Sequence, residues 1–462
     1  MSQDRPDRIE SDSMGDVSIP GWAYWGAQTQ RAVENFSVSP NRIPKPMVRA
    51  LALIKKHAAV ANGELGTVDA KLAGAIVQAA DEVLAGKWDD HFPIDVFQTG
   101  SGTSWNMNAN EVIANRASEL LGAPIGRRDP VHPNDHVNRG QSSNDVIPTA
   151  LHIADRLELT AAAAALRTLS ASFAAKAKEF AKVIKIGRTH LQDAVPMTLG
   201  QEFEGYAVQM KKGADRLERV GSSLEELALG GTAVGTGLNA HPKFAERAIA
   251  GIAKETGVPF RAAESRFEAI GTRDAQVELA GALNGVAVSL MKIANDLRLL
   301  ASGPRAGLGE IILPALQPGS SIMPGKINPV IPEMIIQVAA HIIGICGSIT
   351  AAGQNSPLEL NMMHPLLAHE TLSALALLTE SCNAFATRCV DGIAADQERC
   401  TYWIEWSLAL VTPLATRIGY DKAAELAHIA YEEKRTIREV VLESGLLPEE
   451  EVDRLLDPSS MV

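Results

Sequence analysis

The stretch LAGALNGVAVSLMKIANDLRLL, at residues 279–300, carries the clearest structural signal in the sequence. Its large aliphatic side chains recur at spacings that alternate between four and three residues, which is an unbroken heptad pattern. The positions concerned are Leu279, Leu283, Val286, Leu290, Ile293, Leu297 and Leu300. Because this spacing keeps one apolar stripe on the same side of a helix, it predicts a long helix packed against partner helices.

The residues around this stretch predict where the helix begins and ends. Thr272 is the expected N-cap, and Gly303-Pro304 is expected to stop the helix. At about 1.5 Å per residue, the 22 residues of the stretch form a rod of roughly 33 Å. A rod of that length needs partners of similar length along its apolar side.

Four other apolar stretches predict such partners, at residues 150–180, 198–229, 328–353 and 358–382. About five long helices with few strand signals between them are typical of an elongated antiparallel bundle. Apolar faces this long exceed what one bundle buries, so we expect subunits to associate. Residues 1–40 contain little helical periodicity and predict an extended arm.

The composition excludes several classes of protein. The chain has 462 residues, of which 46% are apolar, so it can bury a large core and is not disordered as a whole. Its formal charge of −12 and the lack of a long basic run argue against sequence-independent binding of nucleic acid, which needs clustered Lys and Arg. A few well-placed cations could still bind a small anionic substrate.

The four cysteines suggest neither disulfides nor a zinc site. Cys346, Cys382, Cys389 and Cys400 all lie in the last third of the chain, without a C-x-x-C pair or a His at zinc-ligand spacing. We therefore expect buried or inert thiols in a reducing compartment, and no metal. The acidic residues 1–14 are typical neither of a secretory signal nor of a transit peptide, so we expect a cytoplasmic protein.

One stretch is long and apolar enough to be considered as a membrane span. Residues 335–353 contain no Asp, Glu, Lys or Arg, and about 19 residues can cross a bilayer. Polar residues interrupt the stretch, and no basic cluster flanks it. These polar residues are Gln337, His341, Ser348 and Thr350. We interpret the stretch as a helix at the centre of a large bundle, buried in protein and not in lipid.

Polar, glycine-rich loops lie between the predicted helices. They read TGSGTS at residues 99–104, HPND at 132–135, QSSND at 141–145, GRTH at 187–190 and GSSIMPGKINP at 319–329. Each brings hydroxyl, amide or backbone N–H groups to the start of a predicted helix, where the helix dipole favours an anion.

Each loop taken alone also has an ordinary explanation. Residues 99–104 can be a turn followed by an N-cap, and a single histidine such as His190 is more often a packing or surface residue than a catalyst. Residues 319–329 do not form a nucleotide-binding phosphate loop. Five residues separate Gly319 from Gly325 instead of four, and Ile327 replaces the metal-binding Ser or Thr.

Taken together, the loops suit the binding of a dicarboxylate and the removal of a proton next to a carboxylate. Such a C–H group is weakly acidic, so the enzyme must stabilise the doubly charged aci-carboxylate that forms. Lys326, Asn328, Thr189 and residues 142–144 are donors of the kind that this chemistry requires. With no strong metal constellation in the sequence, polar donors must supply the stabilisation.

The loop at residues 319–329 closely resembles the signature loop of the fumarase/aspartase superfamily. Similar motifs are AYWGAQT at residues 23–29, FQTGSGT at 97–103, HPNDHVN at 132–138, QSSN at 141–144 and GRTH at 187–190. The resemblance covers essentially the whole chain and is closest to the class II fumarate hydratases, the iron-independent kind. It implies an all-helical fold of three domains, at residues 1–141, 142–364 and 365–462, with a central bundle of about five long helices.

The same resemblance implies a hydro-lyase that reversibly hydrates fumarate to (S)-malate, a step of the tricarboxylic acid cycle, without metal or organic cofactor. It implies a homotetramer whose central bundles merge into one core. Its active sites draw loops from three subunits, which would explain why the polar loops lie far apart in sequence. Beyond the small dicarboxylate and other copies of the chain, we expect no partner, neither nucleic acid nor membrane.

Aspartase is the close alternative within the superfamily. Aspartases usually have QSTND where this chain has QSSND at residues 141–145, PAK where it has PGK at residues 324–326, and Asn at the position of His132. All three positions favour a fumarate hydratase. A second alternative, from another class, is a catalytically inactive helical scaffold that keeps the loops for assembly only.

The resemblance also assigns roles by position. Ser320 corresponds to the general base that takes the C3 proton of malate, with loop N–H groups and Lys326 stabilising its alkoxide. His190 corresponds to the acid that protonates the departing hydroxyl through a water, and Glu333 to the carboxylate that orients this histidine. The substrate-binding positions are Ser101, Gly102, Thr103, Ser142, Ser143, Asn144, Thr189, Ser321, Lys326 and Asn328. A second, peripheral dicarboxylate site corresponds to His132, Pro133, Asn134 and Asp135.

The chain departs from the family's pattern at two places. Trp105 stands beside the binding loop where relatives have a small residue, and we expect it to fill a subunit contact. Asp129 stands where relatives have an Arg three residues before the His-Pro-Asn-Asp loop, so that Arg is not carried over. Arg128 is the candidate substitute.

Overall fold

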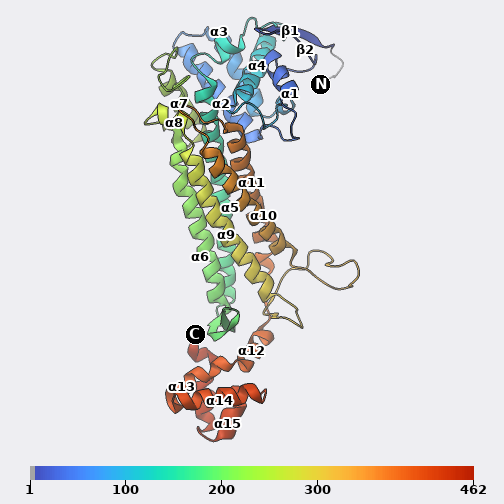
Figure 1. Ribbon diagram of the computed structural model, residues 1–462, viewed down its shortest axis with the longest axis vertical. Coiled ribbons are helices and arrows are strands. Elements are labelled where there is room, and N and C mark those ends of the chain that lie inside the picture. Colours follow the sequence, from blue (N-terminus) through green and yellow to red (C-terminus); the bar gives the residue numbers. More distant parts are fainter. Residues whose placement is uncertain (1–5) are drawn as a thin grey trace. The chain divides into compact units, whose positions relative to one another are not determined.

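The computed structural model describes residues 6–462 and is predominantly helical (Figure 1). Contacts divide the chain into two compact units, and each unit is made of three segments. The first unit contains the chain up to Ala163, Asp215–Gly285 and His341–Leu377; the second contains Ala164–Ala214, Val286–Ala340 and Leu378–Val462. The division into three domains along the sequence, at residues 142 and 365, stays a prediction.

The five predicted long helices are all present, and their bounds lie close to those expected. They are α5 (Ser143–Glu179), α6 (Leu199–Gly221), α9 (Asp274–Leu300), α10 (Val330–Gly353) and α11 (His364–Arg388). In the described part of the chain every sheet has only two strands. The all-helical fold class predicted from the sequence is therefore confirmed.

The heptad positions of α9 lie inside the protein. All seven aliphatic residues of the pattern are at most 5% exposed, so the apolar stripe is the packed side of the helix. The predicted N-cap is wrong by one residue, because α9 begins at Asp274 and Thr272 instead ends the short helix α8 (Arg266–Gly271), where it donates a hydrogen bond to Glu268. The end of the helix at Leu300 lies just before the predicted stop.

In the first unit, side chains of the long helices bond across the bundle. Asp155 of α5 accepts hydrogen bonds from Gln276 of α9 at 3.3 Å and from Thr371 of α11 at 2.6 Å. Ser348 of α10 donates to Glu370 of α11 at 3.1 Å. Segments of four long helices are thus side by side in this unit.

In the second unit, an aromatic cluster joins the long helices. Phe173 of α5 has its ring centroid 6.0 Å from that of Phe203 and 5.7 Å from that of Tyr206, both on α6. It also lies 5.9 Å from the ring of Phe385 on α11. Tyr206 donates a 3.0 Å hydrogen bond to Asp296 of α9, so four helices meet around these rings.

The first unit also contains the N-terminal elements, which differ from the extended arm that we expected. Residues 8–19 form a β-hairpin, and a short helix follows it. The elements are β1 (Arg8–Asp12), β2 (Gly15–Ile19), α1 (Ala27–Asn35), α2 (Lys45–Glu64), α3 (Ala70–Leu84), η1 (Asp89–His91), α4 (Thr103–Leu120) and the π-helical turn η2 (Pro133–Val137). The smaller η3 (Ser223–Glu225), β5 (Glu226–Leu227), α7 (Phe244–Thr256) and β6 (Arg261–Ala262) complete this unit, together with α8.

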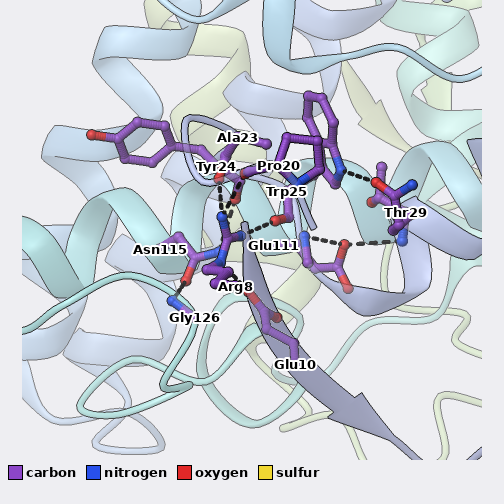
Figure 2. Close-up of polar contacts among 12 residues, drawn as sticks. Arg8, Glu10, Pro20, Ala23, Tyr24, Trp25, Thr29, Glu111, Asn115 and Gly126 are labelled. Atoms are coloured by element: carbon purple, nitrogen blue, oxygen red, sulfur yellow. Dashed lines mark hydrogen bonds and ion pairs between the residues drawn. The ribbon is translucent and has the colours of Figure 1, made fainter. Parts of the chain in front are cut away.

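A buried carboxylate explains why the AYWGAQT motif folds against α4. Glu111 of α4, 4% exposed, accepts hydrogen bonds from the backbone N–H groups of Gly26, Gln28 and Thr29 at 2.9–3.1 Å. Figure 2 shows the bond from Thr29. These N–H groups are the unpaired donors at the start of α1. Arg8 donates to the carbonyl oxygens of the same segment from the other side. These hydrogen bonds therefore hold the AYWGAQT motif against α4.

The second unit contains one further hairpin and the C-terminal helices. The hairpin is β3 (Ile184–Thr189) with β4 (Gln192–Thr198), and β7 (Ile311–Ile312) pairs with β8 (Ala394–Ala395). The C-terminal elements are η4 (Val390–Gly392), α12 (Gln397–Trp406), η5 (Leu408–Leu410), α13 (Val411–Ile418), α14 (Tyr420–Glu432), α15 (Ile437–Ser444), α16 (Glu449–Leu455) and η6 (Pro458–Met461). Leu414, Leu426 and Val441 belong to their small apolar core, which also includes Ile186 of β3.

The four cysteines are free and buried, as expected. Burial raises the pKa of the thiols of Cys382, Cys389 and Cys400 to about 12, so they are protonated and unreactive at neutral pH. Helices α9 and α10 are long and apolar enough to cross a membrane, and only 44% and 33% of their most apolar windows are buried within this chain. On α9 the large apolar side chains that stay exposed are Val288 and Leu299, whereas the exposed residues of α10 are small or polar.

Candidate active site

The first substrate-binding segment lies at the start of α4. Gly102 precedes the helix with φ +72°, a conformation that favours glycine, and a Cβ there would lie 2.9 Å from Ile147. The hydroxyl groups of Ser101 and Thr103 are 2.9 Å apart and hydrogen-bonded. The two hydroxyls are therefore fixed next to each other by a backbone turn that only glycine allows.

The second segment lies at the start of α5 and is held by a buried carboxylate. Asp145 accepts from the backbone N–H of Ser142 at 2.9 Å, and its other oxygen accepts from the N–H groups of Gly230 and Thr232, each at 2.9 Å. Burial raises the pKa of this carboxyl group to about 6, although the three backbone donors act in the opposite direction. Asn144 donates to the carbonyl oxygen of Ala233 at 2.8 Å. These hydrogen bonds hold residues 142–144 against the backbone of residues 230–233.

A single asparagine joins these two segments. Asn106, one turn into α4 and 1% exposed, donates to the hydroxyl oxygen of Ser143 at 3.0 Å. This hydrogen bond shows that the start of α4, at Thr103, and the start of α5, at Ser143, are adjacent in the first unit. The structure therefore brings together six of the predicted substrate-binding residues: Ser101, Gly102, Thr103, Ser142, Ser143 and Asn144.

The predicted second dicarboxylate site lies in the same unit, at η2. His132 uses its Nδ1 atom to accept from the backbone N–H groups of Asn134 and Asp135, at 3.2 and 3.1 Å. These two hydrogen bonds leave Nε2 as the ring nitrogen available to a ligand. Arg128, the suggested substitute for the missing Arg, has φ +55°. Its charge acts on Glu10. Burial raises the pKa of Glu10 above its ordinary value, although Arg8 and Arg128 act in the opposite direction.

The predicted acid lies at the tip of the β3–β4 hairpin in the second unit. Thr189 pairs with Gln192, so His190 and Leu191 form a two-residue turn with φ of +55° and +60°. Such turns are usually made by Asn or Gly, because side chains are strained at positive φ. His190 is exposed, and the strained turn carries it clear of the sheet.

The base of this hairpin is held by a buried carboxylate that the sequence analysis missed. Glu310, which is 0% exposed, lies 2.8 Å from Arg188 and 3.1 Å from Lys185. Both contacts are ion pairs by distance, without the alignment of a hydrogen bond. Lys185, itself buried, also contacts Glu202 at 2.7 Å. Glu310 therefore connects the strand that carries Thr189 to the segment before the 319–329 loop.

The signature loop at residues 319–329 folds around Ser320. The hydroxyl oxygen of Ser320 accepts from the backbone N–H groups of Ile322 and Met323, at 3.2 and 3.1 Å. Asn328 donates to the carbonyl oxygen of Gly319 at 2.7 Å, and the N–H of Gly319 donates to the carbonyl oxygen of Lys326 at 2.7 Å. These bonds close the loop on itself, with Ser321 and Lys326 exposed.

The second unit alone does not assemble the predicted catalytic group. Within residues 6–462, no hydrogen bond or ion pair joins His190 to Ser320 or to Glu333, which lies in the first turn of α10. The predicted roles of His190, Ser320 and Glu333 stay predictions.

The expectation for Trp105 is wrong. Its side chain is 0% exposed within this single chain, so it packs inside the first unit and cannot fill a subunit contact. Other residues that support the site carried weak sequence signals. Asp145 lies inside the polar run at residues 141–145 and Asn106 just beyond the run at residues 99–104, whereas Glu310 has only the preceding Gly309 to mark it.

Comparison with known proteins agrees with this geometry. The sequence matches the family described as Lyase over residues 15–344 and the one described as Fumarase C C-terminus over residues 410–462. The chain is 56% identical over 462 residues to fumarate hydratase class II of Halobacterium salinarum, covering 100% of this chain and 98% of that protein. It is 51% identical over 456 residues to fumarate hydratase class II of Methylorubrum extorquens, covering 98% and 97%.

A solved structure extends the similarity to the fold. The class II fumarase of Schistosoma mansoni superposes with a TM-score of 0.95 at 42% identity, covering 99% of both chains. The helical fold and the polar loops thus define a lyase of the fumarase/aspartase type. Within that class, the chain belongs to the class II fumarate hydratase family.

Proposed function

We propose that this chain is a hydro-lyase that reversibly hydrates fumarate to (S)-malate, the step of the tricarboxylic acid cycle that its relatives are named for. The observation that carries the proposal is similarity along the whole chain to proteins of one name, with the signature loop GSSIMPGKINP intact at residues 319–329. The relatives named above are fumarate hydratases, which favours this activity over that of an aspartase.

The chemistry begins with removal of the C3 proton of malate, for which we propose Ser320. A serine hydroxyl is a weak base unless its oxyanion is stabilised. The N–H groups of Ile322 and Met323 already donate to this oxygen, so they would stabilise the alkoxide. Removal of the proton places a second negative charge on the neighbouring carboxylate. Lys326 and Asn328 would stabilise this aci-carboxylate.

The departing hydroxyl then needs a proton, which we assign to His190 acting through a water. Glu333 would orient this histidine and balance its charge. Ser101, Thr103, Ser142, Ser143, Asn144, Thr189 and Ser321 would bind the two carboxylates, with Gly102 shaping the turn. In the hydration direction the same groups exchange roles. The residues His132, Pro133, Asn134 and Asp135 are proposed to bind a second dicarboxylate at the periphery.

The active site would form between subunits of a homotetramer, with loops from three of them. Two observations support this. His190, Ser320 and Glu333 do not bond to one another within the described chain. Less than half of the most apolar windows of α9 and α10 is buried within this chain, so both helices have a side on which another subunit could pack. We therefore interpret both helices as protein interfaces in a cytoplasmic enzyme, not as membrane spans.

Turnover on a panel of four-carbon acids tests the activity. We expect ultraviolet absorbance of fumarate to appear from (S)-malate and not from aspartate. Consumption of aspartate without malate would contradict the proposal. We expect activity to survive exhaustive chelation, because the proposed groups include no metal, and loss on chelation that iron restores would contradict this.

Ser320→Ala tests the proposed base. It should lower kcat by about 100-fold or more while leaving the oligomer mass unchanged, because general base catalysis contributes about that much. Unaltered turnover would indicate a different base. It would also leave an inactive scaffold excluded, since that alternative predicts no turnover even in the unaltered chain.

A further inference from the structure

A buried lysine contacts the turn that leads into the second substrate-binding segment. Lys55 is on α2 and is 0% exposed, whereas its neighbour Lys56 is partly exposed and forms ion pairs with the exposed carboxylates of Asp81 and Glu255. The Nζ atom of Lys55 donates to the side-chain oxygens of Asn138 at 2.9 Å and Gln141 at 2.8 Å. These three side chains all belong to the first unit.

The ammonium group of Lys55 has no carboxylate partner. In the described part of the chain, no carboxylate oxygen lies within ion-pair distance of it, and Asp145 acts on it only from farther away. Burial lowers the pKa of Lys55 to about 7, and Asp145 opposes this shift. Burying an ammonium group lowers the stability of the folded state unless its hydrogen bonds replace the lost hydration. An apolar residue could fill this position without that loss of stability, so the lysine does more than fill space.

The two amides that accept from Lys55 hold a short turn closed. Because the ammonium group only donates, it fixes which end of each amide faces it. The amide nitrogen of Asn138 is thereby turned to donate to the backbone oxygen of Gln141 at 3.2 Å. The amide nitrogen of Gln141 donates to the backbone oxygen of Val137 at 3.1 Å. Both bonds cross the turn at residues 138–141.

This turn connects two parts of the proposed chemistry. On one side it follows η2 and the predicted second site at residues 132–135. On the other side it leads directly into residues 142–144. Asn106 ties the turn to the first segment as well, because its amide donates to the oxygen of Asn138 at 3.3 Å and to Ser143 at 3.0 Å. Lys55 is thus the buried donor at the centre of this polar network.

We propose that Lys55 is a positioning residue for the hydration reaction: its ammonium group locks the turn at residues 138–141 and thereby aims Ser142, Ser143 and Asn144 at the substrate carboxylate. The inference rests on the proposed function of these three residues. Lys55 itself does not contact the substrate, so its removal should disturb substrate binding more than the chemical step.

Lys55→Met tests the proposal, with Lys56→Met as the matched control on the same helix. The substitution keeps the length of the side chain and removes the three donors. We expect kcat/KM for malate and fumarate to fall by about 100-fold, mostly through KM, because small displacements of binding groups have effects of that size. Lys56→Met should keep kcat/KM within about twofold, because Lys56 pairs with Asp81 and Glu255 and not with the turn at residues 138–141.

Hydrogen exchange supplies a readout that does not depend on turnover. In Lys55→Met, the amides of residues 138–146 should exchange faster, while those of α3 and α7 keep their protection. A purely structural lysine predicts the opposite combination: a lower Tm with KM within about twofold of the unaltered chain, measured well below that Tm. That result would overturn the proposal.

A second variant covers the case in which Lys55→Met does not fold. Gln141→Leu leaves Lys55 in place but removes one of its acceptors and the hydrogen bond from the Gln141 side chain to Val137, while the backbone oxygen that accepts from Asn138 remains. It should raise KM by about tenfold or more. An unchanged KM in this variant would also overturn the proposal. Failure of the proposed function is a separate result, because it would appear as absent malate turnover in the unaltered chain.

Discussion

The backbone N–H of His364 donates a 3.0 Å hydrogen bond to the carbonyl oxygen of Gly100, which joins the start of α11 to the first substrate-binding segment. The backbone of Gly100 also packs closely against Met362: a Cβ built on Gly100 would lie 1.9 Å from the carbonyl oxygen of Met362. This neighbour is backbone and cannot rotate away. The segment before α11 therefore sets the position of Ser101 and Thr103.

Gly100→Ala should displace the hydroxyls of Ser101 and Thr103. We expect kcat/KM for malate to fall by about 100-fold and stability to fall by about 1–3 kcal/mol, because the backbone must move to admit the methyl group. The measurements are steady-state kinetics and thermal unfolding. Gly74→Ala is the control, because this exposed glycine of α3 has no atom near its Cβ position, and alanine should stabilise the helix slightly. Wild-type kinetics in Gly100→Ala would contradict the assignment.

Glu111→Gln should destabilise the N-terminal region. The carboxylate accepts from three backbone N–H groups at the start of α1, and an amide would turn its own donors toward them. We expect a loss of about 1–3 kcal/mol, visible as a lower Tm. Glu64→Gln breaks only an exposed pair with Arg247 and should change stability by less than about 0.5 kcal/mol. Equal Tm values for both variants would show that Glu111 does not cap α1.

The bundle and the loops were predictable from sequence for a physical reason. The heptad spacing of residues 279–300 depends only on local periodicity, and burial of every heptad position confirms it. The polar loops were visible because glycine, serine and asparagine mark helix ends. The sequence therefore predicts that Ser101, Thr103 and Ser143 lie at the starts of helices, and the structure places them at the starts of α4 and α5.

The supports of the site were not predictable, because nothing local marks them. The β3–β4 hairpin was missed, since His190 and Leu191 occupy a turn that normally requires Asn or Gly. Lys55 stands next to Lys56 in the sequence, and only the fold shows that Lys55 is fully buried whereas Lys56 is partly exposed. Glu310 meets Lys185 across more than a hundred residues, which no periodicity reveals.

Asp155 makes the stability of the first unit depend on pH. Burial raises the pKa of its carboxyl group to about 7, although the hydrogen bonds from Thr371 and Gln276 lower it. The folded state therefore binds this proton more tightly than the unfolded state, where the pKa is about 4. The resulting stability is fully present below about pH 4 and is lost as the pH rises toward 7, by at most about 1.4 kcal/mol per pH unit.

Asp155→Asn removes this titration and tests its sign. The Tm of the unaltered chain minus that of the variant should decrease between about pH 4 and pH 7 and stay level above that range. Other titrating groups are common to both proteins and cancel in the difference. A difference that is constant over this range, or that increases with pH, would mean that Asp155 is charged in the folded state throughout.

Glu310→Gln should loosen the hairpin that carries His190. The side chain is fully buried between Lys185 and Arg188, so the substitution leaves two cations without their shared partner. Removing one member of a buried ion pair costs about 3–5 kcal/mol, and part of this loss should appear locally as faster hydrogen exchange in β3 and β4. Because Thr189 and His190 end this hairpin, kcat should fall as well. Glu202→Gln is the control, since it contacts only Lys185 among these cations and leaves Glu310 in place. Its effect should be smaller in both measurements. A larger effect of Glu202→Gln than of Glu310→Gln would show that Glu202, and not Glu310, supports the hairpin.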